Sequence, residues 1–238
     1  ASLTESQIES RRYGRFKSES GLVYPEFDEN VHVIEPFNIP PEWQDTISID
    51  PGLNNPLSAH WYAVDYDGNV YVTYEHFEAK RDIFYHSNAI KNISNKIGWK
   101  RDSYGRVLAL IDSAANQKTL ASNKSVTELF YEQGIVCNPN VNKDMFSGIQ
   151  RVKEYLIGDT GKPKLYIFKN CPNLIRELKN YRWQSGDTPK KSDDHALDEL
   201  RYYLMTKPKN EMALPQKSAV QKDKERLFRK ILNERRNK

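Results

Sequence analysis

Cysteine is nearly absent from this sequence of 238 residues. Cys137 and Cys171 are the only two, and they do not form a C-x-x-C pair. Two isolated cysteines supply neither a disulfide framework nor a cysteine-based zinc site. Because structural disulfides belong to oxidising compartments, this usage predicts reduced thiols in a cytosolic protein that is not secreted.

Long apolar runs and secretion signals are also missing. No segment approaches the roughly 20 apolar residues of a membrane-spanning helix, and residues 1–15 are polar and charged, which predicts that there is no signal peptide. Residues 158–162 contain two glycines and a lysine but lack the G-x-x-x-x-G-K-[ST] spacing of a phosphate-binding loop. The sequence therefore predicts neither a membrane protein nor a P-loop NTPase.

Positive charge is unevenly distributed along the chain. The net charge is +4, and residues 217–238 hold nine Lys or Arg residues against three Asp or Glu. Two interpretations stay open for this segment: a solvated helix whose apolar stripe binds a partner, or a tail that seeks phosphate. The stripe would consist of Leu227, Phe228, Ile231 and Leu232.

Hydrophobic patterning predicts an α/β fold. Three β-rich runs come first, and Asp67-Gly68 between the second and third is typical of a hairpin. Helices and strands then alternate, which indicates a mixed central sheet, three antiparallel strands followed by parallel ones, with helices on both faces. The predicted strands are 46–50, 59–66, 69–74, 106–112, 135–137 and 164–168, and the predicted helices are 81–96, 125–133, 143–156, 173–180 and 190–205.

Composition divides the chain into three parts. Residues 1–42 are punctuated by glycine and proline and are expected to be a lead-in that packs against the rest. Residues 43–208 contain the predicted sheet and form the main domain. Residues 209–238 form the basic tail, which is expected to be helical or flexible.

Two predicted central strands each end in an aspartate. Asp50 follows Ile47-Ser48-Ile49, and Asp112 follows a continuous apolar run. In α/β sheets, ligand sites form where the carboxyl ends of strands meet, and an acid there is held rigidly. The alternatives are local: Asp50 before Pro51-Gly52 suits the first position of a β-turn, and Asp112 could cap the next turn.

The last predicted helix, within 190–205, is rich in acids. Ser192 is a candidate N-cap, and an apolar stripe on one side is expected to face the core. Asp194 and Asp198 are four residues apart and would repel one another unless a cation lay between them. Asp193 and Asp194 could equally be ordinary helix-start acids that favour the macrodipole. The stripe comprises Ala196, Leu197, Leu200, Tyr203 and Leu204.

Several carboxylates that converge on one point suit a pair of divalent cations. Two ions about 3.5–4 Å apart can activate a water and stabilise the leaving oxygen in phosphodiester hydrolysis. Oxygen ligands favour Mg²⁺ or Mn²⁺, and His195 could add a ligand or move a proton. His60, His76 and His86 show no ligand spacing and are interpreted as structural, and Glu75 is a weaker outer candidate.

With these residues in view, the chain resembles the nuclease domain of large terminases, the DNA-packaging motors of tailed bacteriophages and herpesviruses. The resemblance extends from about Gly14 to Leu204 and implies the ribonuclease H-like fold, shared with Holliday-junction resolvases and retroviral integrases. The most specific piece is Tyr181-Arg182-Trp183 followed by residues 194–202. The other pieces are residues 20–27, Ile49-Asp50-Pro51-Gly52, Ile111-Asp112-Ser113-Ala114 and residues 143–152.

The resemblance implies a metal-dependent endonuclease that cuts concatemeric double-stranded DNA when packaging starts and ends, in the cytoplasm of the host cell. Asp50 and Asp112 match the first two metal ligands, and the third falls among Asp194, His195 and Asp198, of which we favour Asp198 with His195. Asp193 is interpreted as a capping acid. Two Mg²⁺ or Mn²⁺ ions are the implied cofactors. The implied partners are a packaging ATPase domain, which this chain does not include, a small terminase subunit and a portal protein.

Basic residues near these motifs are candidates for contacts to the DNA backbone, which position DNA without reading its sequence. They are Lys143, Lys169, Arg182, Lys190 and Lys191. Three alternatives stay open: a junction resolvase or integrase-like nuclease, an actin-like ATPase, and a non-catalytic module that docks on DNA or a portal. The actin-like alternative needs glycine-rich phosphate loops, and residues 53–56 after Gly52 do not supply one.

Overall fold

The computed structural model describes residues 21–118, 123–158, 161–184 and 188–206. The predicted basic tail, with its apolar stripe, lies outside these residues, as does the first part of the lead-in. In the described parts of the chain, no helix is long and apolar enough to cross a membrane.

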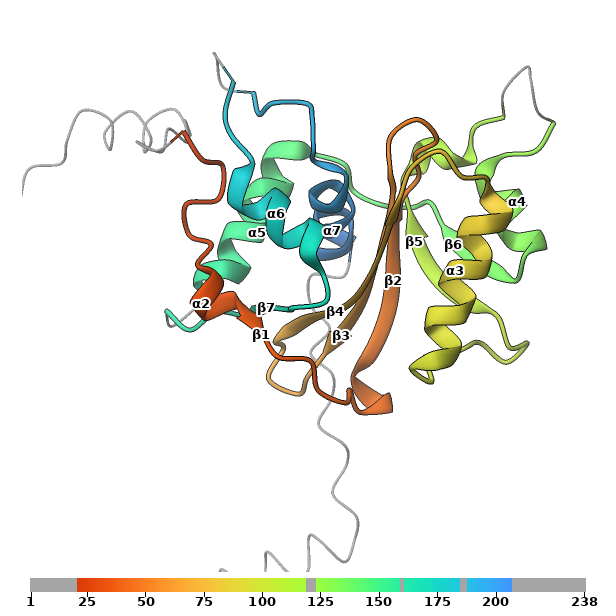
Figure 1. Cartoon of the computed structure of the whole chain (residues 1–238), viewed down its shortest axis with the longest axis horizontal. Helices are drawn as coiled ribbons and strands as arrows, with labels where there is room; N and C mark the ends of the chain where they lie inside the picture. The colour runs from red at the N-terminus through yellow and green to blue at the C-terminus, as the bar shows by residue number, and fades with distance from the viewer. Residues whose placement is uncertain (1–20, 119–122, 159–160, 185–187, 207–238) are drawn as a thin grey trace, which may run out of the picture.

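In the part of the chain that the structure describes, a mixed sheet of seven strands has the order β1-β7-β4-β3-β2-β5-β6 (Figure 1). The strands β2, β3 and β4 form an antiparallel meander, β5 and β6 add parallel strands beside β2, and β7 and β1 add parallel strands beside β4. This confirms the predicted mixed α/β sheet. The bounds are β1 Val33–Ile34, β2 Gln44–Asp50, β3 Leu57–Val64, β4 Val70–Glu78, β5 Val107–Ile111, β6 Ile135–Asn138 and β7 Leu165–Phe168.

Helices cover both faces of the sheet, as predicted. The helices α3 and α4 lie on one side, and α5, α6 and α7 lie on the other (Figure 1). The bounds are α3 Ile83–Lys96, α4 Val126–Glu132, α5 Met145–Ile157, α6 Pro172–Asn180 and α7 His195–Thr206.

The turn between β3 and β4 is longer than the predicted two-residue hairpin. The strand β3 ends at Val64 and β4 begins at Val70. Between them, the side chain of Asp65 accepts hydrogen bonds from the N–H groups of Asp67 and Asn69 at 2.9 and 2.8 Å. Gly68 takes φ +79°, a left-handed conformation that glycine adopts without steric cost. The Asp-Gly signal therefore marks the turn correctly, and an Asx turn sets its length.

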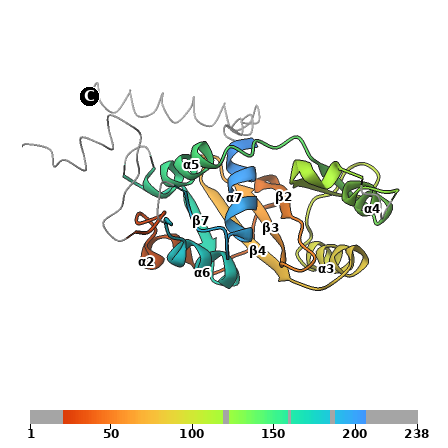
Figure 2. The ribbon, with the colours of Figure 1, turned by 90° about the horizontal axis from the view of Figure 1, so that it is seen from above.

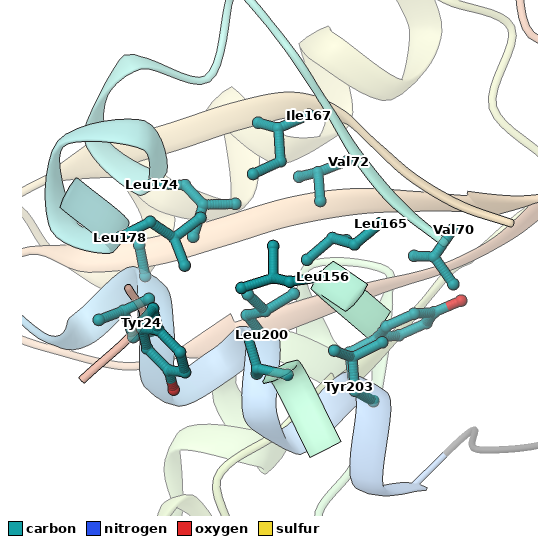
Figure 3. Packing of buried hydrophobic residues seen from close by; sticks show 14 of the residues in the cluster. Tyr24, Val70, Val72, Leu156, Leu165, Ile167, Leu174, Leu178, Leu200 and Tyr203 are labelled. Carbon is teal, nitrogen blue, oxygen red and sulfur yellow. The ribbon is translucent and has the colours of Figure 1, made fainter. Parts of the chain in front are cut away.

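The helix α7 is central to the second face. It packs on β2, β3 and β5 and against α5 and α6, and Figure 2 shows it crossing the middle of the sheet. All five residues of its predicted apolar stripe are buried. Figure 3 shows two of them, Leu200 and Tyr203, among the core side chains of the sheet and of α5. The apolar stripe therefore fixes the rotation of α7 about its axis, and hence the direction of its polar residues.

The described part of the lead-in is built into this fold. Val23 and Tyr24 are fully buried in the core. Three short elements follow: α2 Glu29–His32, β1 at one edge of the sheet, and a 3₁₀ turn, η1, Pro41–Trp43. Residues 21–42 thus pack on the same sheet that carries the strand-end acids.

Candidate active site

The carboxyl ends of β2 and β5 lie side by side at one edge of the sheet. Ile49 pairs with Ile111 in parallel register, and the N–H of Asp112 donates to the carbonyl oxygen of Ile49 at 3.3 Å. Asp50 and Asp112 therefore leave the sheet next to one another, as expected for neighbouring parallel strands. The two strand-end acids and the start of α7 meet here, since Nδ1 of His195 lies 3.0 Å from Oδ2 of Asp50.

A hollow of about 700 Å³ opens in front of these residues. We call it the acidic hollow, because its lining includes Asp112, Asp144, Asp193, Asp194 and Asp198 as well as His195. Four cationic side chains share the lining: Lys143, Arg176, Lys191 and Arg201. Asp50 is not part of the lining and contacts it through His195.

Asp50 is a buried carboxyl group with 8% of its surface exposed. Burial raises its pKa, and the charges of Asp112 and Asp194 add to that rise, while the hydrogen bond with His195 opposes it. The same hydrogen bond is the main cause that raises the pKa of His195 above its ordinary value. The hydrogen bond between Asp50 and His195 thus joins the carboxyl end of β2 to the start of α7.

Asp112 is held by three hydrogen bonds. Its Oδ1 accepts from Nζ of Lys143 and from the N–H of Ala114, both at 2.7 Å, and its Oδ2 accepts from the hydroxyl of Tyr202 at 3.1 Å. Burial acts to raise the pKa of Asp112, but these donors outweigh it and hold the pKa below its usual value. The bond from Ala114 caps a 3₁₀ turn, η2, Ser113–Asn116. The capping alternative is therefore realised without moving Asp112 away from the site.

The start of α7 differs from the prediction. The helix begins at His195, so Ser192 is not its N-cap, and the hydroxyl of Ser192 finds no hydrogen-bond partner among the described residues. Asp193 is not a cap either, since it takes the left-handed φ of +54° before the helix starts. The N–H groups of the first turn donate instead to the side chain of Glu177 in another helix, α6.

Glu177 of α6 caps α7 from outside. Its Oε2 accepts from the N–H groups of Ala196 and Leu197 at 2.8 and 3.2 Å. The side chain is 1% exposed, and burial raises its pKa to about 7. Local sequence around 190–198 contains no sign of this partner. The one signal is an acid inside the otherwise apolar face of the predicted helix 173–180, beside Leu174 and Leu178.

The two acids at the start of α7, Asp194 and Asp198, already have partners. Asp198, the favoured third ligand, forms an ion pair with the buried guanidinium of Arg201. Asp194 lies one residue before the helix, where its carboxylate accepts from the hydroxyl of Tyr181 at 3.4 Å. Both acids line the acidic hollow. They therefore flank the strand-end acids, but each is engaged by a donor from the protein.

The donor set has the chemistry of a hard-metal site. Within the described residues, no three His, Cys, Asp or Glu side chains stand close enough together to hold a metal ion as they are. Three of the acids are paired with protein side chains: Asp112 with Lys143, Asp50 with His195 and Asp198 with Arg201. A divalent cation fits the carboxylates by type and charge, provided that it displaces these donors.

The predicted DNA-contacting residues fall into three places. Lys143 and Lys191 line the acidic hollow. Arg182 and Lys190 line an adjoining hollow of about 450 Å³, which we call the basic hollow. Lys169 lines neither of them and forms an ion pair with Glu35. Four of the five thus surround the site, and the fifth lies apart from it.

A second buried network, which was not predicted from the sequence, joins α7 to the sheet. His60 of β3 lies between the carboxylates of Glu199 and Glu75, which raise its pKa to about 10 against the opposing effect of burial. Glu75, the weaker outer candidate, also accepts from the N–H groups of Asn173 and Leu174 at the start of α6. Glu75 is therefore committed to joining α6 to the sheet and lines neither hollow.

His76 and His86 contact each other, with Nε2 of His76 lying 2.9 Å from Nδ1 of His86. Neither residue lines the acidic or the basic hollow. Burial is the main cause that lowers the pKa of His76 to about 4. The interpretation of His60, His76 and His86 as structural agrees with these positions.

Comparison with known proteins identifies the fold family. The model of the terminase RNase H-like domain family matches residues 47–207. No protein in the curated set matches the chain. Among solved structures, the nuclease domain of the P22 large terminase has a TM-score of 0.65 at 17% identity, and the match covers 79% of this chain and 93% of that one.

Two further phage proteins are similar. The large terminase of a thermophilic bacteriophage has a TM-score of 0.62 at 21% identity, and the match covers 86% of this chain but 52% of that one. The large-terminase nuclease domain of bacteriophage SPP1 with bound Mn has a TM-score of 0.48 at 17% identity, covering 74% of this chain and 96% of that one. The chain therefore spans about half of the thermophilic phage protein. Since the family model covers more than half of this chain, the chain belongs to the terminase RNase H-like domain family.

Proposed function

We propose that this domain is a metal-dependent endodeoxyribonuclease that cuts double-stranded DNA through Asp50, Asp112 and the acidic start of α7. The main support is one observation: two adjacent parallel strands end in Asp50 and Asp112 beside His195, in front of a hollow lined by further acids. Membership of the terminase family makes hydrolysis of the DNA backbone the natural reaction for that arrangement.

The residues that would hold the divalent cations are Asp50 and Asp112, completed by Asp198 and His195, with Asp194 as an additional donor. Two bound Mg²⁺ or Mn²⁺ ions would activate a water and stabilise the leaving oxygen of the cleaved phosphodiester. The sheet holds the two strand-end acids rigidly, and the buried stripe of α7 holds the third group at a fixed rotation. Such fixed positions limit the reorganisation that the reaction requires.

The donors now on these acids have roles of their own. Lys143 neutralises Asp112, and Arg201 neutralises Asp198, so the cluster of acids remains stable without a metal ion. Lys143 is 40% exposed at its side chain and borders the acidic hollow. Once released from Asp112, its ammonium group would remain beside the position of the DNA phosphate.

The substrate we propose is concatemeric viral DNA, cut when packaging begins and ends. Lys191, Lys190 and Arg182 lie along the two adjoining hollows and supply backbone contacts that do not depend on sequence. The packaging ATPase domain, the small terminase subunit and the portal protein would bring the DNA and time the cut.

A plasmid assay tests this proposal. Supercoiled plasmid is incubated with Mn²⁺ or Mg²⁺ and the wild type, Asp50→Asn, Asp112→Asn, or Glu154→Gln, an exposed acid of α5 outside both hollows. The wild type and Glu154→Gln should nick and linearise the plasmid. Each aspartate variant should lose about 100-fold or more of the rate.

Two outcomes would overturn parts of the account. Cleavage at the wild-type rate by both aspartate variants would show that the assigned site is wrong. Strong preference for a four-way junction over linear duplex, measured in the same buffer, would indicate a resolvase-like enzyme instead.

A further inference from the structure

Resting on the proposed nuclease function, we infer that Arg176 of α6 binds the phosphodiester backbone of DNA where the acidic hollow meets the basic hollow. Arg176 lines both hollows, together with Ser192 and Asp193. It also lines a third hollow, of about 820 Å³, with Lys169 and Lys179. A DNA strand that ran from the acidic hollow into the basic hollow would pass its guanidinium group.

The guanidinium of Arg176 is held in place by neighbours that leave most of its donors available. Its Nη1 donates to Oδ1 of Asn173 at 2.7 Å, and its carbon lies 5.6 Å from the ring centre of Phe77, which also lines the acidic hollow. Asn173 is fixed in turn by Glu75, which accepts from its amide at 2.7 Å. An arginine that is already oriented loses little side-chain entropy when it binds a phosphate.

One acid forms a long ion pair with Arg176. Glu177 approaches Nη2 only to 3.7 Å with Oε1, while its Oε2 is used by the start of α7. Asp193 is the other acid in the basic hollow, and it stands against three cations there, Arg176, Arg182 and Lys190. Among the described residues that line the basic hollow, three are basic and two, Glu177 and Asp193, are acidic, a composition that suits an anionic strand.

A phosphodiester backbone is the occupant that fits best. A planar guanidinium can donate to two oxygens of one phosphate group. Arg176 also lines the acidic hollow, where the proposed cleavage would take place. Every phosphate that a cation neutralises releases counterions, so the contact has a measurable signature. Loss of one such contact lowers the slope of log affinity against log salt concentration by about 0.9.

The test measures duplex binding without cleavage. Fluorescence anisotropy of a labelled DNA duplex in EDTA, over a series of salt concentrations, compares the wild type with Arg176→Gln and Arg176→Lys. Arg151→Gln is the matched control, because Arg151 is an arginine of α5 that pairs with Glu154 and lines neither hollow. Melting temperatures of all four proteins show whether each is folded.

Arg176→Gln should bind several-fold more weakly and with a slope smaller by about 0.9. Arg176→Lys should keep the wild-type dependence of affinity on salt concentration but bind DNA more weakly. A lysine keeps the positive charge but cannot donate to two phosphate oxygens with a planar guanidinium. Binding by folded Arg176→Gln with wild-type affinity and slope would overturn the inference, as would an equal loss in Arg151→Gln.

Plasmid cleavage by the wild type, measured beside the binding series, separates this inference from the proposed function. If the wild type does not cut DNA but the slope still falls in Arg176→Gln, the nuclease proposal fails and the DNA contact stands. If the wild type cuts DNA and the slope does not change, only the role of Arg176 is wrong.

Discussion

Glu177 of α6 accepts a 2.8 Å hydrogen bond from the N–H of Ala196, the second residue of α7. Its Oε2 also accepts from Leu197. These bonds satisfy donors that a helix start otherwise leaves without partners, and they fix the point where α7 begins. Because His195 immediately precedes Ala196, the buried carboxyl group of Glu177 positions the residue that meets Asp50.

Replacing Glu177 should destabilise the protein in proportion to the acceptors removed. Glu177→Ala leaves two buried N–H groups without an acceptor and should lower the free energy of unfolding by about 2–4 kcal/mol. Glu177→Gln keeps one carbonyl acceptor and should cost about 1 kcal/mol. Urea denaturation gives both values, with the surface variant Glu154→Ala as the control expected within about 0.5 kcal/mol. Equal losses in the alanine and glutamine variants would contradict the capping role.

Glu177 should also make stability depend on pH. Its pKa rises from 4.5 to about 7 on folding because the group is buried, so the folded state binds a proton more tightly than the unfolded state. The resulting stability is fully present below pH 4.5 and is lost as pH rises to about 7. Relative to Glu177→Gln, the wild type should lose at most about 3 kcal/mol over this window. Parallel stability curves for the two proteins would contradict this.

Gly148 of α5 packs closely against Arg201 of α7. A Cβ atom there would lie 2.9 Å from Cδ and 3.1 Å from Cβ of Arg201, whose guanidinium pairs with Asp198. Arg201 is buried and has little room to move. Gly148→Ala should therefore lower the free energy of unfolding by about 1–3 kcal/mol, measured by urea denaturation. Ser147→Ala, one residue earlier and exposed, should change it by less than about 0.5 kcal/mol; a similar loss in both would contradict the packing argument.

In the proposed metal site, Lys143 would compete with metal ions for Asp112. Since a partly exposed ion pair contributes about 0.5–1 kcal/mol, Lys143→Ala should bind Mn²⁺ about two- to fivefold more tightly in calorimetric titration, while its affinity for DNA falls. Lys124→Ala removes a comparable surface pair with Glu132, which lies away from both hollows, and should change neither. Weaker Mn²⁺ binding by Lys143→Ala would show that the lysine supports the metal ion.

The sequence predicts most of the fold because the hydrophobic pattern is strong. The strand-end positions of Asp50 and Asp112 follow from buried runs that precede them, and the rotation of α7 follows from its apolar stripe. The stripe also contains a signal that is easy to miss, since Glu199 lies three residues after Ala196 on the same face. An acid in an apolar stripe requires a buried partner, and β3 supplies it in His60.

What could not be predicted depends on contacts between segments far apart in the chain. Ser192 and Asp193 have the residue types of a helix start, yet Glu177 supplies the cap, because tertiary packing brings α6 against α7. Lys143, expected on DNA, donates to Asp112 from 31 residues away. Neither partner has a local pattern that would reveal it.

The most direct test of the metal site is a crystal structure of the domain soaked in Mn²⁺, with anomalous scattering to locate the ions. We predict Mn²⁺ within coordination distance of both Asp50 and Asp112 and of at least one of Asp194, His195 and Asp198, with Lys143 moved off Asp112. A structure in which Mn²⁺ contacts neither Asp50 nor Asp112, while Lys143 keeps its hydrogen bond, would contradict the account.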